Sequence, residues 1–177
     1  MRSTALLSPL VLALAPIAAQ AAEPPCLTAT EFTALSSYAL PSIITGTTER
    51  CATALPADAW LRRNGGQLAA RYAAGKPAAW PAAKAAFFKF GGSSANPETA
   101  NLLKSLPDSS LQPMVDALIS GMIGQQLPAE RCGAIDRLVR LLAPLPPENT
   151  AELIAVAAGL GAKTGRARLG KFSICPA

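Results

Sequence analysis

The clearest pattern of apolar and polar positions in the chain lies between Ser109 and Leu142. In its first half, apolar side chains recur at steps of three and four, which is the spacing of one helix face. These positions are Leu111, Met114, Val115, Leu118, Ile119, Met122 and Ile123. After a break at Gln126-Leu127-Pro128, a second stripe follows at Cys132, Ile135, Leu138, Val139 and Leu142. Two amphipathic helices with so short a link are typical of an αα-hairpin, and we expect the hairpin over 109–142 to be the centre of the fold.

Capping signals mark the starts of two helices. Thr28-Ala29-Thr30-Glu31 has the form of a capping box, which predicts a helix that begins at Ala29 and bends or ends at Pro41. Ser109 and Gln112 have the spacing of a second capping box, at the entry to the hairpin. The N-terminal part of the chain and the hairpin should therefore both begin with defined helix starts.

The remaining stretches predict further short helices. They lie near residues 56–64, 67–74, 80–90, 97–106 and 149–160, and Gly91 to Ser94 is expected to be a flexible tether between two of them. No stretch alternates for long enough to form a sheet. The predicted fold is all-α, a small disulfide-stapled helical bundle of about six to seven short helices.

The N-terminus has the pattern of a secretory signal peptide over residues 1–21. Arg2 supplies the positive start, Ala5 to Ala19 the apolar stretch, and Ala19-Gln20-Ala21 an A-x-A cleavage site. A transmembrane anchor needs about 20 apolar residues, and this stretch is shorter and interrupted by proline. We expect cleavage after Ala21, which leaves residues 22–177 as a single α-helical domain in the periplasm or outside the cell.

All four cysteines follow the predicted cleavage site, and an even number of cysteines in an exported chain predicts two disulfides. We favour Cys26–Cys51 and Cys132–Cys175, because each bridge would close a loop around local helices. A first helix that ends near Leu40 is roughly 18 Å long, and the residues after it can span that distance back to Cys26. The alternative is Cys26–Cys175, which would tie the two ends of the chain together. The sequence has no C-x-x-C motif and no histidine, which argues against a metal site.

The lack of histidine also restricts the possible chemistry. It removes the commonest general base and excludes every catalytic triad that uses one. Paired carboxylates remain, and the closest pairs in sequence are Glu130 with Asp136 and Glu148 with Glu152. Glu148 and Glu152 have the spacing of two residues that favour a helix start through the helix dipole. We predict no catalytic residue, no cofactor and no metal, and keep a histidine-free hydrolase that uses carboxylates as the alternative.

Two stretches have a composition that suits binding. Lys163, Arg166, Arg168 and Lys171 place four positive charges in a short tail, which could contact an anionic lipid surface or polyanion or simply be solvated. Trp80, Phe87 and Phe90 share one face of a predicted helix, which could lie on a membrane or line an apolar pocket, or could supply core volume.

The net charge of +5 falls to +4 once Arg2 leaves with the signal peptide, so the mature chain is moderately basic. Nucleic acid is a poor partner for an exported protein, and no transmembrane helix is expected after cleavage. The leading hypothesis is an exported helical binding or interaction protein without catalytic activity. Its expected partner is a lipid, an envelope polymer or another protein.

Overall fold

The computed structural model describes residues 26–94, 96–163 and 175, and every regular element in these ranges is a helix. The elements are α1 (Ala29–Cys51), α2 (Trp60–Ala73), α3 (Lys76–Ser94), α4 (Pro97–Ser105), α5 (Asp108–Gln126), the 3₁₀ turn η1 (Ala129–Arg131), α6 (Cys132–Leu142) and α7 (Pro147–Lys163). The all-α bundle with two disulfides is therefore confirmed. The predicted signal peptide lies outside the described residues.

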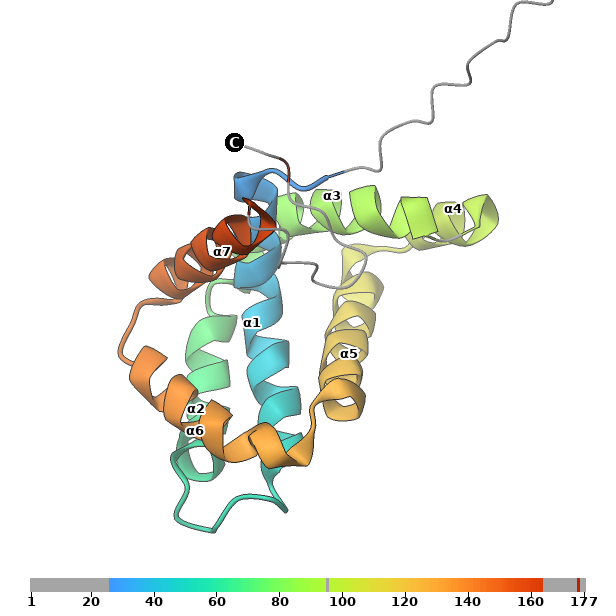
Figure 1. Cartoon of the computed structure of the whole chain (residues 1–177). Coiled ribbons are helices and arrows are strands. Elements are labelled where there is room, and N and C mark those ends of the chain that lie inside the picture. The colour runs from blue at the N-terminus through green and yellow to red at the C-terminus, as the bar shows by residue number, and fades with distance from the viewer. Residues whose placement is uncertain (1–25, 95, 164–174, 176–177) are drawn as a thin grey trace, which may run out of the picture.

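α1 is the central helix, and α2, α3, α5 and α7 all pack against it (Figure 1). Its middle, from Tyr38 to Thr47, is buried on several faces and includes small or polar residues such as Ser42 and Gly46. A helix that is buried on most of its sides shows no narrow apolar stripe, because little of its surface faces water. The central position of α1 is therefore not visible as a periodic pattern.

The hairpin predicted over 109–142 is only partly correct. Its two helices exist as α5 and α6, and the break between them falls at Leu127 as expected. However, α5 packs against α1 and α6 packs against α2, so the two helices lie on different sides of the bundle (Figure 1). Both helices leave part of the predicted stripe exposed, namely Met114, Leu118 and Met122 of α5 and Leu138 of α6, and in α5 only Leu111 and Val115 are buried. The hairpin is therefore not the centre of the fold.

The start of α1 agrees with the prediction, but its end does not. The hydroxyl of Thr28 accepts from the backbone N–H of Glu31 at 3.2 Å, and the Glu31 carboxylate accepts from the Thr28 N–H at 2.8 Å, which completes the capping box. A hydrogen bond from Lys89 lowers the pKa of Glu31, and the Thr28 backbone bond adds to this effect. Pro41 does not end the helix, which continues for 23 residues to Cys51. The buried contacts around Pro41 offset its missing N–H donor.

The length of α1 corrects the predicted disulfide pairing. A helix of 23 residues is about 34 Å long, so Cys26 before it and Cys51 at its end lie too far apart to bond. The structure instead joins Cys26 to Cys175 and Cys51 to Cys132, with Cα–Cα distances of 5.0 and 5.5 Å. The pairing Cys26–Cys51 with Cys132–Cys175 was wrong because the first helix was expected to end near Pro41.

Three smaller expectations also change. α2 runs without interruption through Gly65 and Gly66, and α3 extends through Gly91 to Ser94, the predicted tether. α5 begins at Asp108 after Pro107, so Ser109 and Gln112 do not form a capping box. Asp108 accepts from Lys84 at 2.6 Å, and this bond lowers the pKa of Asp108. At the start of α5, an ion pair with a residue of another helix therefore takes the place of the predicted local capping box.

A polar network ties α1, α3 and α5 together. The Asp116 carboxylate of α5 accepts from the Ser42 hydroxyl at 2.9 Å and from Lys76 at 2.5 Å. The Lys76 ammonium also lies 4.4 Å from the centre of the Tyr38 ring, and burial raises the pKa of Tyr38. Because the network satisfies these polar groups within the protein, α1 can carry them inside the bundle.

Candidate functional site

The predicted aromatic face lies in the core. Trp80 is 5% exposed, and its ring centre lies 4.8 Å from that of Tyr38. Phe87 is half-buried, packs against the same cluster and meets Phe88 edge-on at 5.5 Å. The side chain of Phe90 is outside the described part of the chain. Trp80 and Phe87 therefore supply core volume between α1, α3 and α5.

The basic tail cannot be placed in the fold. α7 ends at Lys163, whose side chain is not described, and Arg166, Arg168 and Lys171 lie outside the described residues. Its contact with an anionic partner stays a prediction.

The two carboxylate pairs singled out in the sequence, Glu130 with Asp136 and Glu148 with Glu152, lie in different surroundings in the fold. Asp136 of α6 accepts from the backbone N–H of Leu61 at 2.6 Å, so it caps the first turn of α2, which has no side-chain cap of its own. Glu130 is exposed in η1. Glu148 and Glu152 lie at the start of α7 and border an open depression of about 520 Å³. Asp136 thus has a structural task that the sequence did not reveal.

The structure places the two kinds of basic residue in different parts of the bundle. All seven described arginines belong to the last turn of α1, to α2, to η1 or to α6, and α6, η1 and the last turn of α1 lie in the lower half of Figure 1. They are Arg50, Arg62, Arg63, Arg71, Arg131, Arg137 and Arg140. We call this region, residues 49–73 and 129–142, the arginine-rich end. It holds seven arginines and four acidic residues, whereas the other described residues include five lysines and six acidic residues.

The ion pairs follow the same division. Among the described residues there are three, Lys76–Asp116, Lys84–Asp108 and Lys89–Glu31, and all of them use lysine. Three arginines donate to backbone carbonyls instead, namely Arg50 to Leu127, Arg62 to Leu55 and Arg71 to Ala143. Within the described ranges, no carboxylate lies within salt-bridge distance of an arginine. The arginine-rich end therefore has a net charge of +3, seven arginines less four acidic residues, and none of its arginines forms an ion pair with a described carboxylate.

The exposed side of α6 combines two of these arginines with two leucines. Cys132 and Val139 face inward against Leu55 and Leu61 of the core. Arg140 is exposed and follows Asp136 by one helical turn, so it lies at the edge of the outer surface of α6 that is next to α2.

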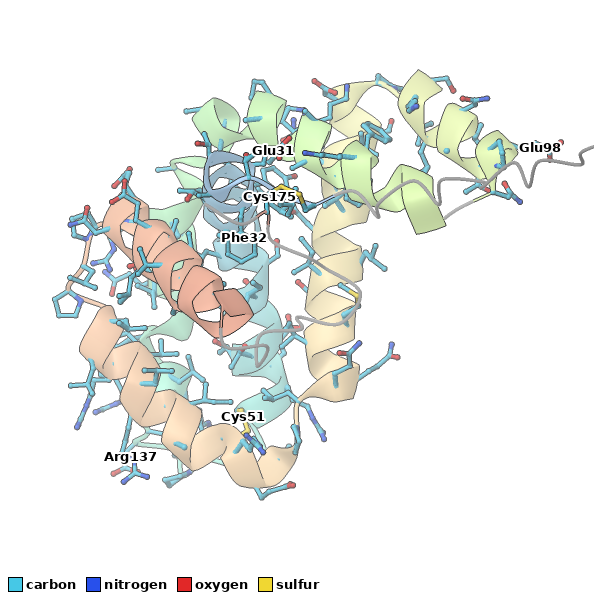
Figure 2. The ribbon with its side chains drawn as sticks, turned by 45° about the horizontal axis from the view of Figure 1, so that its top comes forward. Glu31, Phe32, Cys51, Glu98, Arg137 and Cys175 are labelled. Carbon is cyan, nitrogen blue, oxygen red and sulfur yellow. A yellow bond between two sulfur atoms is a disulfide. The ribbon has the colours of Figure 1, made fainter. Side chains whose placement is uncertain are left out.

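Leu138 and Leu141 lie on the outer side of α6, where they are 55% and 71% exposed. Arg137 is at the outer edge of the molecule and points away from the bundle (Figure 2). Around the helix it lies between Arg140 and Leu141. The outward surface of α6 is therefore basic on one flank and apolar on the other.

An open groove runs along α2 beside this helix. Its wall is a row of side chains at helical spacing, Trp60, Asn64, Gln67 and Arg71, and Ala143 at the end of α6 closes it. The groove has a volume of about 470 Å³. The Asn64 amide donates to the Trp60 carbonyl at 2.8 Å, which fixes part of the wall. The groove extends the arginine-rich end with an aromatic ring and two amides.

The residue types at this end have the chemistry that suits anions. A guanidinium group presents paired N–H donors that match the oxygens of a phosphate or carboxylate group, and it stays charged at any physiological pH. In the described residues, no group of three or more acidic, cysteine or histidine side chains is placed to hold a metal ion. Within residues 26–94 and 96–163, no helix combines the length and apolar character needed to span a bilayer.

Sequence reasoning missed this surface because its arginines are scattered along the chain. The Cys51–Cys132 disulfide joins α6 to the end of α1, and the Asp136–Leu61 hydrogen bond joins α6 to the start of α2. One local signal was available, the repeat Arg137-Leu138-Val139-Arg140-Leu141-Leu142. Comparison of the chain with models of protein families, with curated proteins and with solved structures finds no match.

Proposed function

We propose that this chain is an extracytoplasmic binding protein whose arginine-rich end contacts an anionic component of the cell envelope. The signal-peptide pattern and the two disulfides support a location in the periplasm or outside the cell. The partner is defined by its chemistry, which is a dense array of phosphate or carboxylate groups.

One observation carries the proposal: the arginines gather at one end without carboxylate partners among the described residues, while the three ion pairs use lysines elsewhere. An exposed charge that was needed only for solubility would be equally useful anywhere on the surface. Concentration on one face raises the local potential and favours an extended anionic partner over a small ion. Guanidinium groups also bind such partners with better geometry than ammonium groups do.

The test is binding of the full mature protein to vesicles of phosphatidylcholine with and without phosphatidylglycerol, and to soluble polyphosphate. We expect binding to both anionic probes, weaker at high salt, because the Debye length shortens as ionic strength rises. A basic residue near an anionic surface contributes about 1 kcal/mol, so Arg137→Gln with Arg140→Gln should weaken binding roughly thirtyfold. Cosedimentation at several salt concentrations measures this change.

Lys104→Gln provides the matched control. It removes the same charge as Arg140→Gln from an exposed position on α4, away from the arginine-rich end. We expect it to change affinity less than twofold, against roughly fivefold for Arg140→Gln. Equal losses from both variants would mean that net charge alone governs binding, which would overturn the proposed surface. The absence of binding to either anionic probe would overturn the proposed function.

A further inference from the structure

We infer that α6 is a lipid-contacting helix, and that the partner of the arginine-rich end is the surface of an anionic phospholipid bilayer. In this arrangement Leu138 and Leu141 enter the boundary between headgroups and acyl chains, and Arg137 and Arg140 bind lipid phosphates. The inference rests on the proposed function, and it names one source of the anionic groups.

The first support is the exposure of the two leucines. Leu141 is 71% exposed, more than any other large apolar side chain of the described surface, and Leu138 is 55% exposed. They are close neighbours on one helix, because residues three apart lie on the same side. Paired exposed leucines on a basic helix form a contiguous apolar surface, which is typical of an interaction site.

The second support is the order of side chains around α6. The inward side packs against the core through Cys132 and Val139, and the outward side is divided into a basic flank and an apolar flank. A helix of this kind lies in the plane of a membrane interface, with its apolar flank in the boundary region and its cations at the phosphates. The carboxylate of Asp136, on the same helix, is half-buried and accepts from the backbone N–H of Leu61, so it is turned toward α2.

Charge complementarity and the leucines together decide between the possible partners. Arg137, Arg140 and the neighbouring Arg131 suit any polyanion, because phosphate groups in a lipid surface and in a soluble polymer accept the same hydrogen bonds. Exposed leucines add affinity only where the partner offers an apolar phase that removes them from water. A phospholipid surface meets both requirements, and a soluble polyanion meets only the first.

The fold holds α6 ready for this contact. Its first residue is fixed by the Cys51–Cys132 disulfide, and its second turn is fixed by the Asp136–Leu61 hydrogen bond. A helix that is ordered before binding does not lose folding entropy at the surface, so fewer contacts are needed for useful affinity.

Substitution of the leucines separates lipid contact from simple anion binding. We expect Leu138→Gln with Leu141→Gln to weaken binding to phosphatidylglycerol-containing vesicles roughly tenfold, because the apolar area that leaves water is lost. Binding to polyphosphate should be unchanged. Leu102→Gln is the matched control, since Leu102 is 64% exposed on α4 and should affect neither probe. Equal vesicle affinity of the double variant and the unmodified protein would overturn the inference.

A fluorescence readout tests the position of the helix directly. Leu141→Trp and the control Leu102→Trp each add one tryptophan to Trp60 and Trp80, and the unmodified protein gives the background. Vesicles that contain lipids brominated near the headgroup end of the chain should quench the tryptophan at position 141 and not that at 102. Quenching at neither position would refute lipid insertion. If the arginine variants still lose polyphosphate binding in that case, the proposed function stands and only the lipid assignment fails.

Discussion

Loss of the Cys51–Cys132 disulfide is expected to lower the free energy of unfolding by about 4 kcal/mol. The bridge joins residues that are 81 positions apart, so it removes much of the freedom of the unfolded chain. Both cysteines are buried in a core cluster with Leu55 and Leu61. There the bridge joins the last residue of α1 to the first residue of α6, within the arginine-rich end. Denaturation of the variant with Cys51→Ala and Cys132→Ala in guanidinium chloride measures the loss.

The second bridge supplies a control for function. A variant with Cys26→Ala and Cys175→Ala removes the covalent link to position 175, whose N–H donates to the Leu27 carbonyl at 2.8 Å, but leaves the end of α1 joined to α6 through Cys51–Cys132. We expect this variant to bind anionic vesicles with unchanged affinity, whereas the variant without Cys51 and Cys132 should bind them more weakly. A loss of stability below about 1 kcal/mol for the Cys51 and Cys132 variant would contradict the role given to that bridge.

Gly46→Ala is expected to destabilise the protein by about 3 kcal/mol, because the backbone of α5 lies against α1 at this residue. A Cβ atom at Gly46 would lie 2.7 Å from the carbonyl oxygen of Ser120 and 2.9 Å from its Cα. These are backbone atoms, so the clash is relieved only by moving a whole helix. The shift would also disturb the hydrogen bond from the Ser120 hydroxyl to the Ser42 carbonyl, at 3.0 Å. Thermal or denaturant unfolding gives the change.

Gly66→Ala should have the opposite effect. Gly66 is exposed in the middle of α2, and a Cβ there would meet no atom within 4 Å. Alanine in this position gains helix propensity, which should raise the free energy of unfolding by about 0.5–1 kcal/mol. If both glycine variants changed stability in the same direction, the close contact between α1 and α5 would not be the reason for glycine at position 46.

The elements that the sequence predicts well are those with local causes. The capping box at Thr28 and Glu31, the break at Leu127 and the short helix before Pro107 all depend on residues within one or two turns of each other. The prediction that α1 bends or ends at Pro41 was wrong, because the helix continues through Pro41 where it packs against helices that follow later in the sequence. The disulfide pairing failed for the same reason, since it depends on how far apart the ends of α1 lie.

The candidate site divides in the same way. The basic tail around Arg166 and Arg168 is visible in the sequence because its charges are contiguous. The arginine-rich end joins residues that are some 75 positions apart, such as Leu61 and Asp136, and only the fold brings them together. The pattern around Trp80 was compatible with either a ligand-binding face or core volume, and only the fold shows that Trp80 is buried against Tyr38 of the central helix.

In the described part of the fold, lysines and arginines make different kinds of contact. The lysines Lys76, Lys84 and Lys89 hold α3 to α1 and α5 through ion pairs, and so contribute to the bundle itself. Arg50, Arg62 and Arg71 bind backbone carbonyls at the other end and brace the surface there. Arg137 and Arg140 have no such partner among the described residues, and these are the side chains that we assign to the anionic surface.

Footprinting of the arginine side chains tests this assignment most directly. Phenylglyoxal reacts with accessible guanidinium groups, and mass spectrometry of peptides reports each site in the unmodified protein. We expect Arg137 and Arg140 to lose reactivity when vesicles containing phosphatidylglycerol are added, and to keep it with vesicles of phosphatidylcholine alone. Unchanged reactivity of both residues on anionic vesicles, including the case in which only Arg166 and Arg168 are protected, would contradict it.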